Sequence, residues 1–171
     1  ELRRVLERVG RGQMGGSKAL SDEREVMLRC IDSVCKSCAT MQEQKIGALI
    51  VFERSTLLGE IADTGTMIDA QASTQLLSNV FFPKSPLHDG AVILREGRLL
   101  SAGCILPLTS NDSLNSSLGT RHRAAIGISE TSDAAVVIVS EETGIISIAV
   151  NGELTRNYNM ITLHEELNKL L

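Results

Sequence analysis

Residues 91–106 read AVILREGRLLSAGCIL, two apolar runs on either side of the dipeptide Glu96-Gly97. The first run, residues 91–94, and the second, residues 98–106, have the aliphatic character of buried strands. A short connection that contains glycine between two such runs is typical of a β-hairpin. This stretch therefore predicts a pair of antiparallel strands.

More strands and helices are predicted on both sides of this hairpin. Short aliphatic or β-branched runs predict strands over residues 46–52, 134–139 and 145–150. Apolar residues at helical spacing predict helices over 1–9, from an N-cap at Asp22 to Met41, over 69–80, over 121–129, and from a capping box of Thr162 and Glu165 onward. Since hairpins are frequent, we expect an α/β fold with a mixed, largely hairpin-containing central sheet flanked by helices.

The composition fits one compact domain with few aromatic side chains. The 171 residues are 43% hydrophobic, which is enough to bury a single core, and the formal net charge is -4. Three Phe, one Tyr and no Trp leave few platforms on which bases could stack. The acidic balance lacks the broad basic footprint of a nucleic-acid-binding protein, so nucleic acid is not expected as a partner.

The N-terminal region contains a glycine-rich segment. Residues 10–17 include four glycines and predict a flexible linker after the first helix. They also match the dinucleotide-binding pattern G-x-G-x-x-G, but a charged helix precedes them where that motif needs a buried strand. No run reaches the roughly 18 apolar residues of a membrane span. The chain opens without Met inside a predicted helix, so we expect a soluble, trimmed piece of a longer protein.

Three cysteines lie close together in the second predicted helix. Cys35 and Cys38 have the C-x-x-C spacing of some zinc and redox sites, and Cys30 is nearby. The apolar stripe of the helix accounts for all three, Cys104 is far away, and no His is close in sequence. We therefore expect buried structural thiols in a reducing compartment.

A first polar motif is SPLHDGA, residues 85–91, which sets an imidazole beside a carboxylate in front of a predicted strand. Asp89 could orient a hydroxyl or act as a base, and His88 could ligate a divalent metal. Gly90 would let a ligand approach the backbone. The alternative is a plain turn, because Asp-Gly is a common turn dipeptide.

Two further polar motifs follow along the chain. Residues 119–123 read GTRHR at the predicted start of a helix, where free N–H groups and guanidinium groups favour a bound phosphate; a solvated basic turn is the alternative. Residues 140–144 read SEETG after a predicted strand. Their carboxylates could hold a metal while Ser140 bonds a ligand, and an ordinary β-turn is the alternative.

Together, these three motifs closely resemble the diadenylate cyclase (DAC) domain family, with its DGA and RHR motifs. The resemblance runs from about residue 46 to residue 156 and includes GALIVFE at 47–53 and CILPL at 104–108. The opening ELRR followed by Gly10-Arg11 resembles the stretch that joins transmembrane helices to the domain in the membrane-anchored type.

The resemblance implies a location, an activity and an assembly. It implies an N-terminal helix and linker over residues 1–20 from a membrane anchor, and a catalytic domain over 21–171 on the cytoplasmic side of the cell membrane. The implied reaction is a nucleotidyl transfer that condenses two ATP molecules into cyclic di-AMP, a bacterial second messenger, with release of two pyrophosphates and a requirement for Mg²⁺ or Mn²⁺. Because two nucleotides must face each other, a homodimer is expected.

Two other functions remain as alternatives. A noncatalytic sensor would use the same loops to hold ATP or a cyclic dinucleotide, and a metal-dependent phosphohydrolase would cleave ATP. The pair of His88 and Asp89 argues against a sensor, since a sensor has less need for a metal and a base at the ribose.

The resemblance also implies roles for individual residues. Asp89 is the essential acid near the 3′-hydroxyl, and Leu106 packs on adenine. Many members carry an aromatic residue just before this leucine, where this chain has Ile105. The implied sets are Asp89, Arg121, His122 and Arg123 for catalysis; Gly90, Ala91, Leu106, Gly119, Thr120, Arg121, Ser140 and Glu141 for nucleotide binding; and His88 and Glu142 for the metal.

Overall fold

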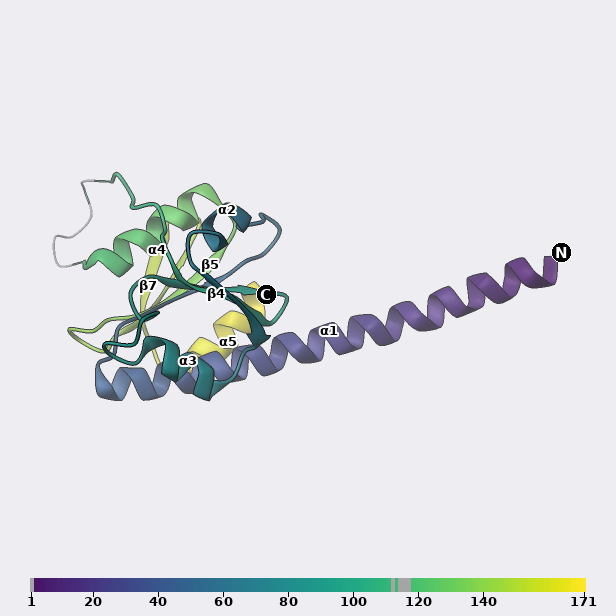
Figure 1. Cartoon of the computed structure of the whole chain (residues 1–171), viewed down its shortest axis with the longest axis horizontal. Helices are drawn as coiled ribbons and strands as arrows, with labels where there is room; N and C mark the ends of the chain where they lie inside the picture. The colour runs from purple at the N-terminus through teal and green to yellow at the C-terminus, as the bar shows by residue number, and fades with distance from the viewer. Residues whose placement is uncertain (1, 112, 114–117) are drawn as a thin grey trace.

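A seven-stranded mixed sheet forms the middle layer of the fold (Figure 1). The computed structural model describes residues 2–111, 113 and 118–171, with only the backbone described for residues 2–17. The strand order is β2-β4-β3-β1-β5-β6-β7. β1 and β3 pair in parallel, and the other neighbouring strands of the described chain pair antiparallel, which confirms the expected mixed, hairpin-containing sheet. The strands are β1 (Ala48–Phe52), β2 (Thr66–Gln71), β3 (Ala91–Arg95), β4 (Arg98–Cys104), β5 (Ala135–Val139), β6 (Ile146–Val150) and β7 (Glu153–Tyr158).

Helices cover both faces of this sheet. In Figure 1, α4 and the short α2 lie above the sheet, whereas α1, α3 and α5 lie below it. The helices are α1 (Leu2–Gln44), α2 (Gly59–Ala62), α3 (Thr74–Phe81), α4 (Thr120–Thr131) and α5 (Met160–Leu170). Among the described residues, no helix combines the length and apolar character that a membrane crossing requires.

The central strand β1 contributes to both layers of the core. Its alternate residues Ala48, Ile50 and Phe52 pack in the cluster on the α1 side. Leu49 and Val51 pack in the cluster on the α4 side. Because successive side chains of a strand point to opposite faces, a strand covered on both faces is apolar at every position.

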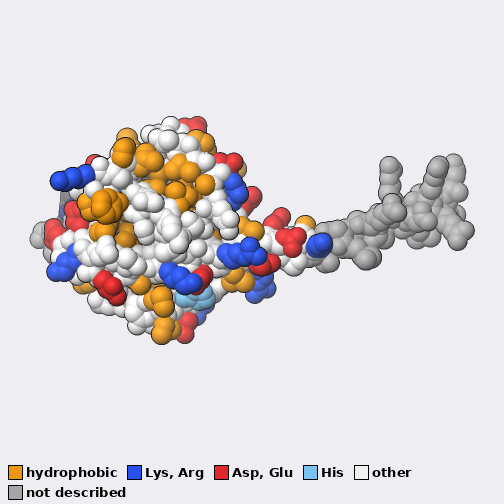
Figure 2. Space-filling view, turned by 60° about the horizontal axis from the view of Figure 1, so that its bottom comes forward, with side chains coloured by type: hydrophobic (Ala, Val, Ile, Leu, Met, Phe, Trp, Pro, Cys, Tyr) orange, Lys and Arg blue, Asp and Glu red, His pale blue; other side chains and the backbone are white. Residues whose placement is uncertain are grey.

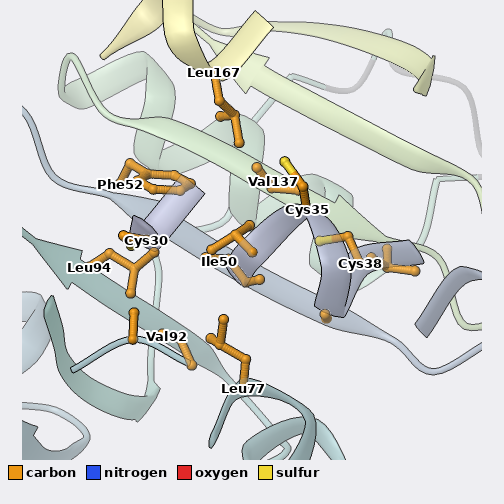
Figure 3. Close-up of a cluster of buried hydrophobic side chains, with 14 of the residues drawn as sticks. Cys30, Cys35, Cys38, Ile50, Phe52, Leu77, Val92, Leu94, Val137 and Leu167 are labelled. Atoms are coloured by element: carbon orange, nitrogen blue, oxygen red, sulfur yellow. The ribbon is translucent and has the colours of Figure 1, made fainter. Parts of the chain in front are cut away.

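The core on the α1 side contains the three clustered cysteines (Figure 3). Cys30, Cys35 and Cys38 lie among aliphatic side chains of the sheet, including Ile50. All three are buried free thiols, as expected from the apolar stripe. Burial raises the pKa of Cys30 and of Cys35 to about 12, so neither is a reactive thiolate near neutral pH.

The charged surface is mixed in sign on the face shown in Figure 2. Lys and Arg side chains lie interspersed with Asp and Glu side chains there, and hydrophobic side chains gather in the upper half of the view. Several of the side-chain pairs are helical neighbours, such as Lys36 with Asp32 at 2.7 Å. Such exposed pairs contribute little to stability.

The glycine-rich segment is helical in the structure. The predicted linker over residues 10–17 and the predicted N-cap at Asp22 are both wrong, because α1 runs without a break from Leu2 to Gln44. The segment contains no proline, and each glycine costs about 1 kcal/mol relative to alanine without removing a backbone N–H donor. A long helix can therefore continue through it. The expected apolar face of residues 1–9 lies outside the described side chains.

The remaining corrections concern strands and caps near the sheet edges. The helix predicted over 69–80 begins too early, because the chain up to Gln71 belongs to edge strand β2. Helix α3 starts only after Ser73, whose hydroxyl caps it by accepting a hydrogen bond from the Leu76 N–H. Strand β7 was not predicted; both residues of the Asn151-Gly152 turn that precedes it have positive φ angles. The final helix is capped by Asn159 instead of Thr162, which occupies the third helical position. Residues 112 and 114–117 of the polar loop before α4 lie outside the described chain.

Candidate active site

The pairing of the strands brings the three polar motifs to one end of the sheet. Ala48, at the start of β1, pairs with Val139 at the end of β5, so the 140–144 segment lies beside the entry to β1. Ala91, at the start of β3, pairs with Cys104 at the end of β4. Since β1 and β3 are parallel, both pairs lie at the same end of the sheet. The start of α4 completes the group, because α4 packs on β1, β5 and β6.

A cleft of about 740 Å³ opens between these segments. Motif residues from three separate parts of the chain line it, and they come from the loop before β3, the first turn of α4 and the loop after β5. The cleft thus joins a carboxylate, a helix start and an ion pair in one hollow. The predicted site residues that line it are Asp89, Gly90, Leu106, Thr120, Arg121 and Glu141.

Gly90 allows the loop that carries Asp89 to lie directly on β4. Its φ angle is +115°, a backbone conformation that residues other than glycine rarely adopt. A Cβ at this position would lie 2.7 Å from the carbonyl carbon of Gly103 and 2.8 Å from the carbonyl oxygen of Cys104. The close backbone contact holds the exposed Asp89 at the cleft.

The ring of His88 is oriented by the backbone. Its Nδ1 lies 2.7 Å from the carbonyl oxygen of Ser85. Because a carbonyl oxygen only accepts, Nδ1 carries the proton and donates it, which leaves the lone pair of a neutral ring on Nε2. His88 is half-buried and lines neither the cleft nor the smaller recess described below.

The first turn of α4 is electrostatically suited to an anion. Its N-cap is Gly119, which has no side chain to cap the helix, and the first turn contains no acidic residue. It carries Arg121, His122 and Arg123 instead, at the end of a helix where the macrodipole is positive. Cations at this end are unfavourable unless an anion binds, and the free N–H groups provide donors for one.

Arg121 is held in place by Glu141 and by a glycine. Its Nη1 donates to Oε2 of Glu141 at 2.8 Å, and its side chain is 21% exposed. A Cβ on Gly47 would lie only 2.6 Å from that Nη1 and 2.8 Å from Cζ. The guanidinium therefore occupies the space that the missing side chain of Gly47 leaves. Gly47 was not among the predicted site residues.

A recess of about 90 Å³ adjoins the cleft at the start of α4. His122 lines it and is only 5% exposed, and its Nε2 has no hydrogen-bond partner within the described chain. Burial lowers the pKa of His122, and Arg156 lowers it further against the opposing effect of Glu142. The other predicted residues that line the recess are Gly119, Thr120, Arg121, Ser140, Glu141 and Glu142, and the recess also contains Arg156, which was not predicted.

The floor of the cleft is apolar. Leu106 is 7% exposed, and it is flanked by Ile105 at 70% and Leu108 at 57%. Gly127 of α4 permits this segment to approach, because a Cβ there would lie 2.2 Å from the carbonyl oxygen of Pro107. The cleft therefore combines an aliphatic surface with the charged first turn of α4, which suits a ligand with one apolar and one anionic part.

Some predicted residues lie away from both hollows. Ala91 is fully buried in the core on the α4 side, and Arg123 is half-buried outside the cleft and the recess. Within the part of the chain that the structure describes, no three His, Cys, Asp or Glu residues gather around one point, so the predicted metal ligands His88 and Glu142 are not part of a cluster of that size.

Comparison with known proteins assigns this arrangement to a family. Residues 35–154 match the DAC family model, described as DisA bacterial checkpoint controller nucleotide-binding. Cyclic di-AMP synthase CdaA of Bacillus subtilis (strain 168) is 44% identical over 167 residues, which are 98% of this chain and 61% of that protein. A diadenylate cyclase of Listeria monocytogenes serotype 1/2a (strain 10403S) is 46% identical over all of this chain and 61% of its own length.

Two crystal structures have the same fold. A double cysteine mutant of DacA from Staphylococcus aureus superposes with a TM-score of 0.81 at 46% identity, covering 87% of this chain and 97% of the solved chain. A hypothetical membrane spanning protein from Bacillus cereus gives a TM-score of 0.71 at 46% identity, covering 73% of this chain and 61% of the other. This chain spans about 61% of the length of each of the two curated relatives named above. The family match, the relatives and the shared fold agree that the chain belongs to the diadenylate cyclase (DAC) domain family.

Proposed function

We propose that this chain is the catalytic domain of a diadenylate cyclase, which condenses two ATP molecules into cyclic di-AMP and releases two pyrophosphates. The observation that carries the proposal is the single cleft that joins Asp89 to the anion-binding start of α4 at Arg121. Two of its relatives are named as a cyclic di-AMP synthase and a diadenylate cyclase. A nucleotidyl transfer needs positioning and charge neutralisation more than covalent chemistry, and this cleft supplies both.

In the proposed reaction, adenine lies on the aliphatic surface of Leu106 and Ile105, and the phosphates lie at the first turn of α4. Asp89 accepts a hydrogen bond from the 3′-hydroxyl, orients its oxygen toward the α-phosphate of the second nucleotide and takes up the hydroxyl proton as the new bond forms. The new bond joins O3′ to the α-phosphorus, and the bond from that phosphorus to the bridging oxygen breaks. Arg121 and the N–H groups of α4 stabilise the charge on the phosphoryl oxygens.

One copy of the cleft accounts for one nucleotide. Cyclic di-AMP contains two equivalent linkages, so each 3′-hydroxyl must reach the α-phosphate held by the other site. Two copies of this chain related by a twofold axis, with the two clefts face to face, satisfy that requirement. The exposed position of Asp89 is consistent with a carboxylate that acts at such a boundary.

A divalent metal, Mg²⁺ or Mn²⁺, would be held by His88 and Glu142 together with a bound nucleotide, because the described residues form no metal cluster of their own. The hydrogen bond from Nδ1 of His88 to Ser85 leaves Nε2 available as a ligand, and Glu142 presents an exposed carboxylate. The remaining ligands would be phosphate oxygens and water, which is the usual arrangement for Mg²⁺ with nucleotides. When bound, the metal neutralises negative charge on the phosphates.

We further propose that the domain works on the cytoplasmic side of the cell membrane as part of a longer, membrane-anchored protein. One structural relative is described as a membrane spanning protein, and the N-terminal residues 1–20 resemble the segment that follows such an anchor. ATP is available in the cytoplasm, which agrees with this orientation.

The proposal is tested by incubating the chain with ATP and Mn²⁺ and identifying the products by mass spectrometry. Formation of cyclic di-AMP and pyrophosphate is expected. Unchanged ATP would indicate a sensor, and ADP or AMP with phosphate would indicate a phosphohydrolase; either result contradicts the proposal. The variant Asp89→Asn serves as the control for contaminating activity, since its side chain keeps the shape but loses the charge.

A further inference from the structure

The recess beside the cleft contains an arginine that none of the three motifs includes. Arg156 lies on β7, exposed to solvent, and lines the recess of about 90 Å³ together with His122 and Thr143. The recess and the main cleft share Thr120, Arg121 and Glu141, so the two hollows meet at these residues.

The register of the sheet explains why Arg156 reaches this place. Leu49 pairs with Ile138, Ile138 pairs with Ser147, and Ser147 pairs with Arg156, which forms one row across four strands. Residues directly opposite on neighbouring strands point to the same face of a sheet. Leu49 and Ile138 pack in the cluster on the α4 side, so Arg156 also points to the side on which α4 begins.

The walls of the recess hold polar groups that have no partner among the described residues. Nε2 of His122 and Nε of Arg121 are buried, and neither makes a hydrogen bond with the part of the chain that the structure describes. Both belong to residues that line the recess, and His122 is 5% exposed. A buried polar group without a partner is costly, so it is normally satisfied by another protein group, by water or by a ligand. Gly119 and Thr120 at the start of α4, where helix N–H groups lack intrahelical acceptors, also line the recess, and together with Nε of Arg121 this helix end offers donors that fit an oxyanion.

The two carboxylates that also line the recess do not oppose an anion there. The charge of Glu141 is paired with Arg121 at 2.8 Å. Glu142 is exposed, and its charge raises the pKa of His122, whereas the charge of Arg156 lowers it. A carboxylate next to a phosphate subsite can hold the divalent cation that accompanies the terminal phosphates of ATP.

We infer that Arg156 binds the terminal phosphates of ATP in this recess, whereas adenosine and the α-phosphate lie in the main cleft. The inference rests on the proposed function. When O3′ attacks the α-phosphorus, the bond to the bridging oxygen breaks and its electron pair leaves with the pyrophosphate. Arg156 then faces the charge that develops on the leaving group. Cyclic di-AMP has no terminal phosphates, so the product does not contact Arg156, and the recess distinguishes substrate from product.

The experiment compares two ligands in calorimetric titrations with Mn²⁺. One is 3′-deoxy-ATP, which carries the triphosphate but lacks the attacking hydroxyl, and the other is cyclic di-AMP. Arg156→Gln is expected to weaken 3′-deoxy-ATP about tenfold or more, because it removes a charge-assisted contact. It is expected to leave the affinity for cyclic di-AMP within about twofold, and Arg156→Lys, which keeps the charge without the fork, gives an intermediate loss.

The control variant is Arg54→Gln, because Arg54 is also exposed and lies beyond the other end of β1. It is expected to change neither affinity. An equal loss for both ligands in Arg156→Gln, or no loss for 3′-deoxy-ATP, overturns the inference. The two claims fail separately. If the wild type makes cyclic di-AMP but Arg156→Gln binds 3′-deoxy-ATP normally, only the inference about Arg156 is overturned. If the wild type makes no cyclic di-AMP, the proposed function is contradicted.

Discussion

Replacing Gly47 by alanine is expected to impair activity with little effect on stability. The new Cβ would lie 2.6 Å from Nη1 of Arg121, so the guanidinium must move by about 0.8 Å to reach the 3.4 Å of an ordinary contact. Displacement of a catalytic group by about 1 Å can cost about 100-fold in rate. Because φ at Gly47 is not positive and Arg121 is a flexible side chain, the free energy of unfolding should change by less than about 1 kcal/mol.

The assay is kcat/KM for cyclic di-AMP formation, with the melting temperature measured in parallel. Gly59→Ala is the matched control, since a Cβ on Gly59 meets nothing within 4 Å, and its activity should equal that of the wild type. The effect of Gly47→Ala should also disappear in an Arg121→Ala background, because the clash acts through the guanidinium. Wild-type activity in a folded Gly47→Ala protein, or an undiminished effect without Arg121, would refute this account of the site.

Three other predictions concern the reaction, the adenine surface and stability. Asp89→Asn should abolish condensation while calorimetry shows ATP affinity within about threefold of the wild type; near-normal turnover contradicts the role of Asp89. Ile105→Tyr should tighten ATP binding by about 1 kcal/mol in the same titration through stacking on adenine, and no gain would place adenine elsewhere. Glu53→Gln should lower the free energy of unfolding at pH 7 by about 2 kcal/mol in urea titrations, because Glu53 accepts two bonds from Arg95, at 2.6 and 2.8 Å, and one from the Leu58 N–H. Burial alone would raise the pKa of Glu53, but hydrogen bonds from Arg95 and Leu58 hold it below its ordinary value of 4.5. The stability that ionised Glu53 contributes is therefore present above pH 4.5 and is lost as the pH falls through the folded-state pKa. Equal acid sensitivity of the wild type and Glu53→Gln would contradict this role of Glu53.

Short-range patterns predicted the parts of the fold that are locally determined. The hairpin of β3 and β4 follows from two apolar runs around Glu96-Gly97, and the buried strands β1 and β5 follow from uninterrupted aliphatic runs. The edge strand β2 could not be predicted in this way, because its residues are mostly exposed and its pairing with β4 includes a bulge. An edge strand owes its conformation to the neighbour with which it pairs, which a local pattern does not contain.

The same distinction holds for the candidate site. The residues Asp89 and Arg121 could be found because each lies in a short polar motif beside an apolar run. Gly47 and Arg156 could not be found, since each depends on contacts between distant segments: Gly47 on the position of Arg121, and Arg156 on its pairing with Ser147. Arg156 follows the Asn151-Gly152 turn, and its place at the recess is evident only when the register of β6 and β7 is known.

The central claim is that two copies of this chain, each with one nucleotide, form the productive species. It is tested by measuring initial rates of cyclic di-AMP formation at saturating ATP over a wide range of protein concentration, with sedimentation velocity under the same conditions. The rate per chain is expected to rise with the fraction of dimer and to become constant once the chain is fully dimeric. A constant rate per chain from a species that sediments as a monomer during turnover would contradict the shared site.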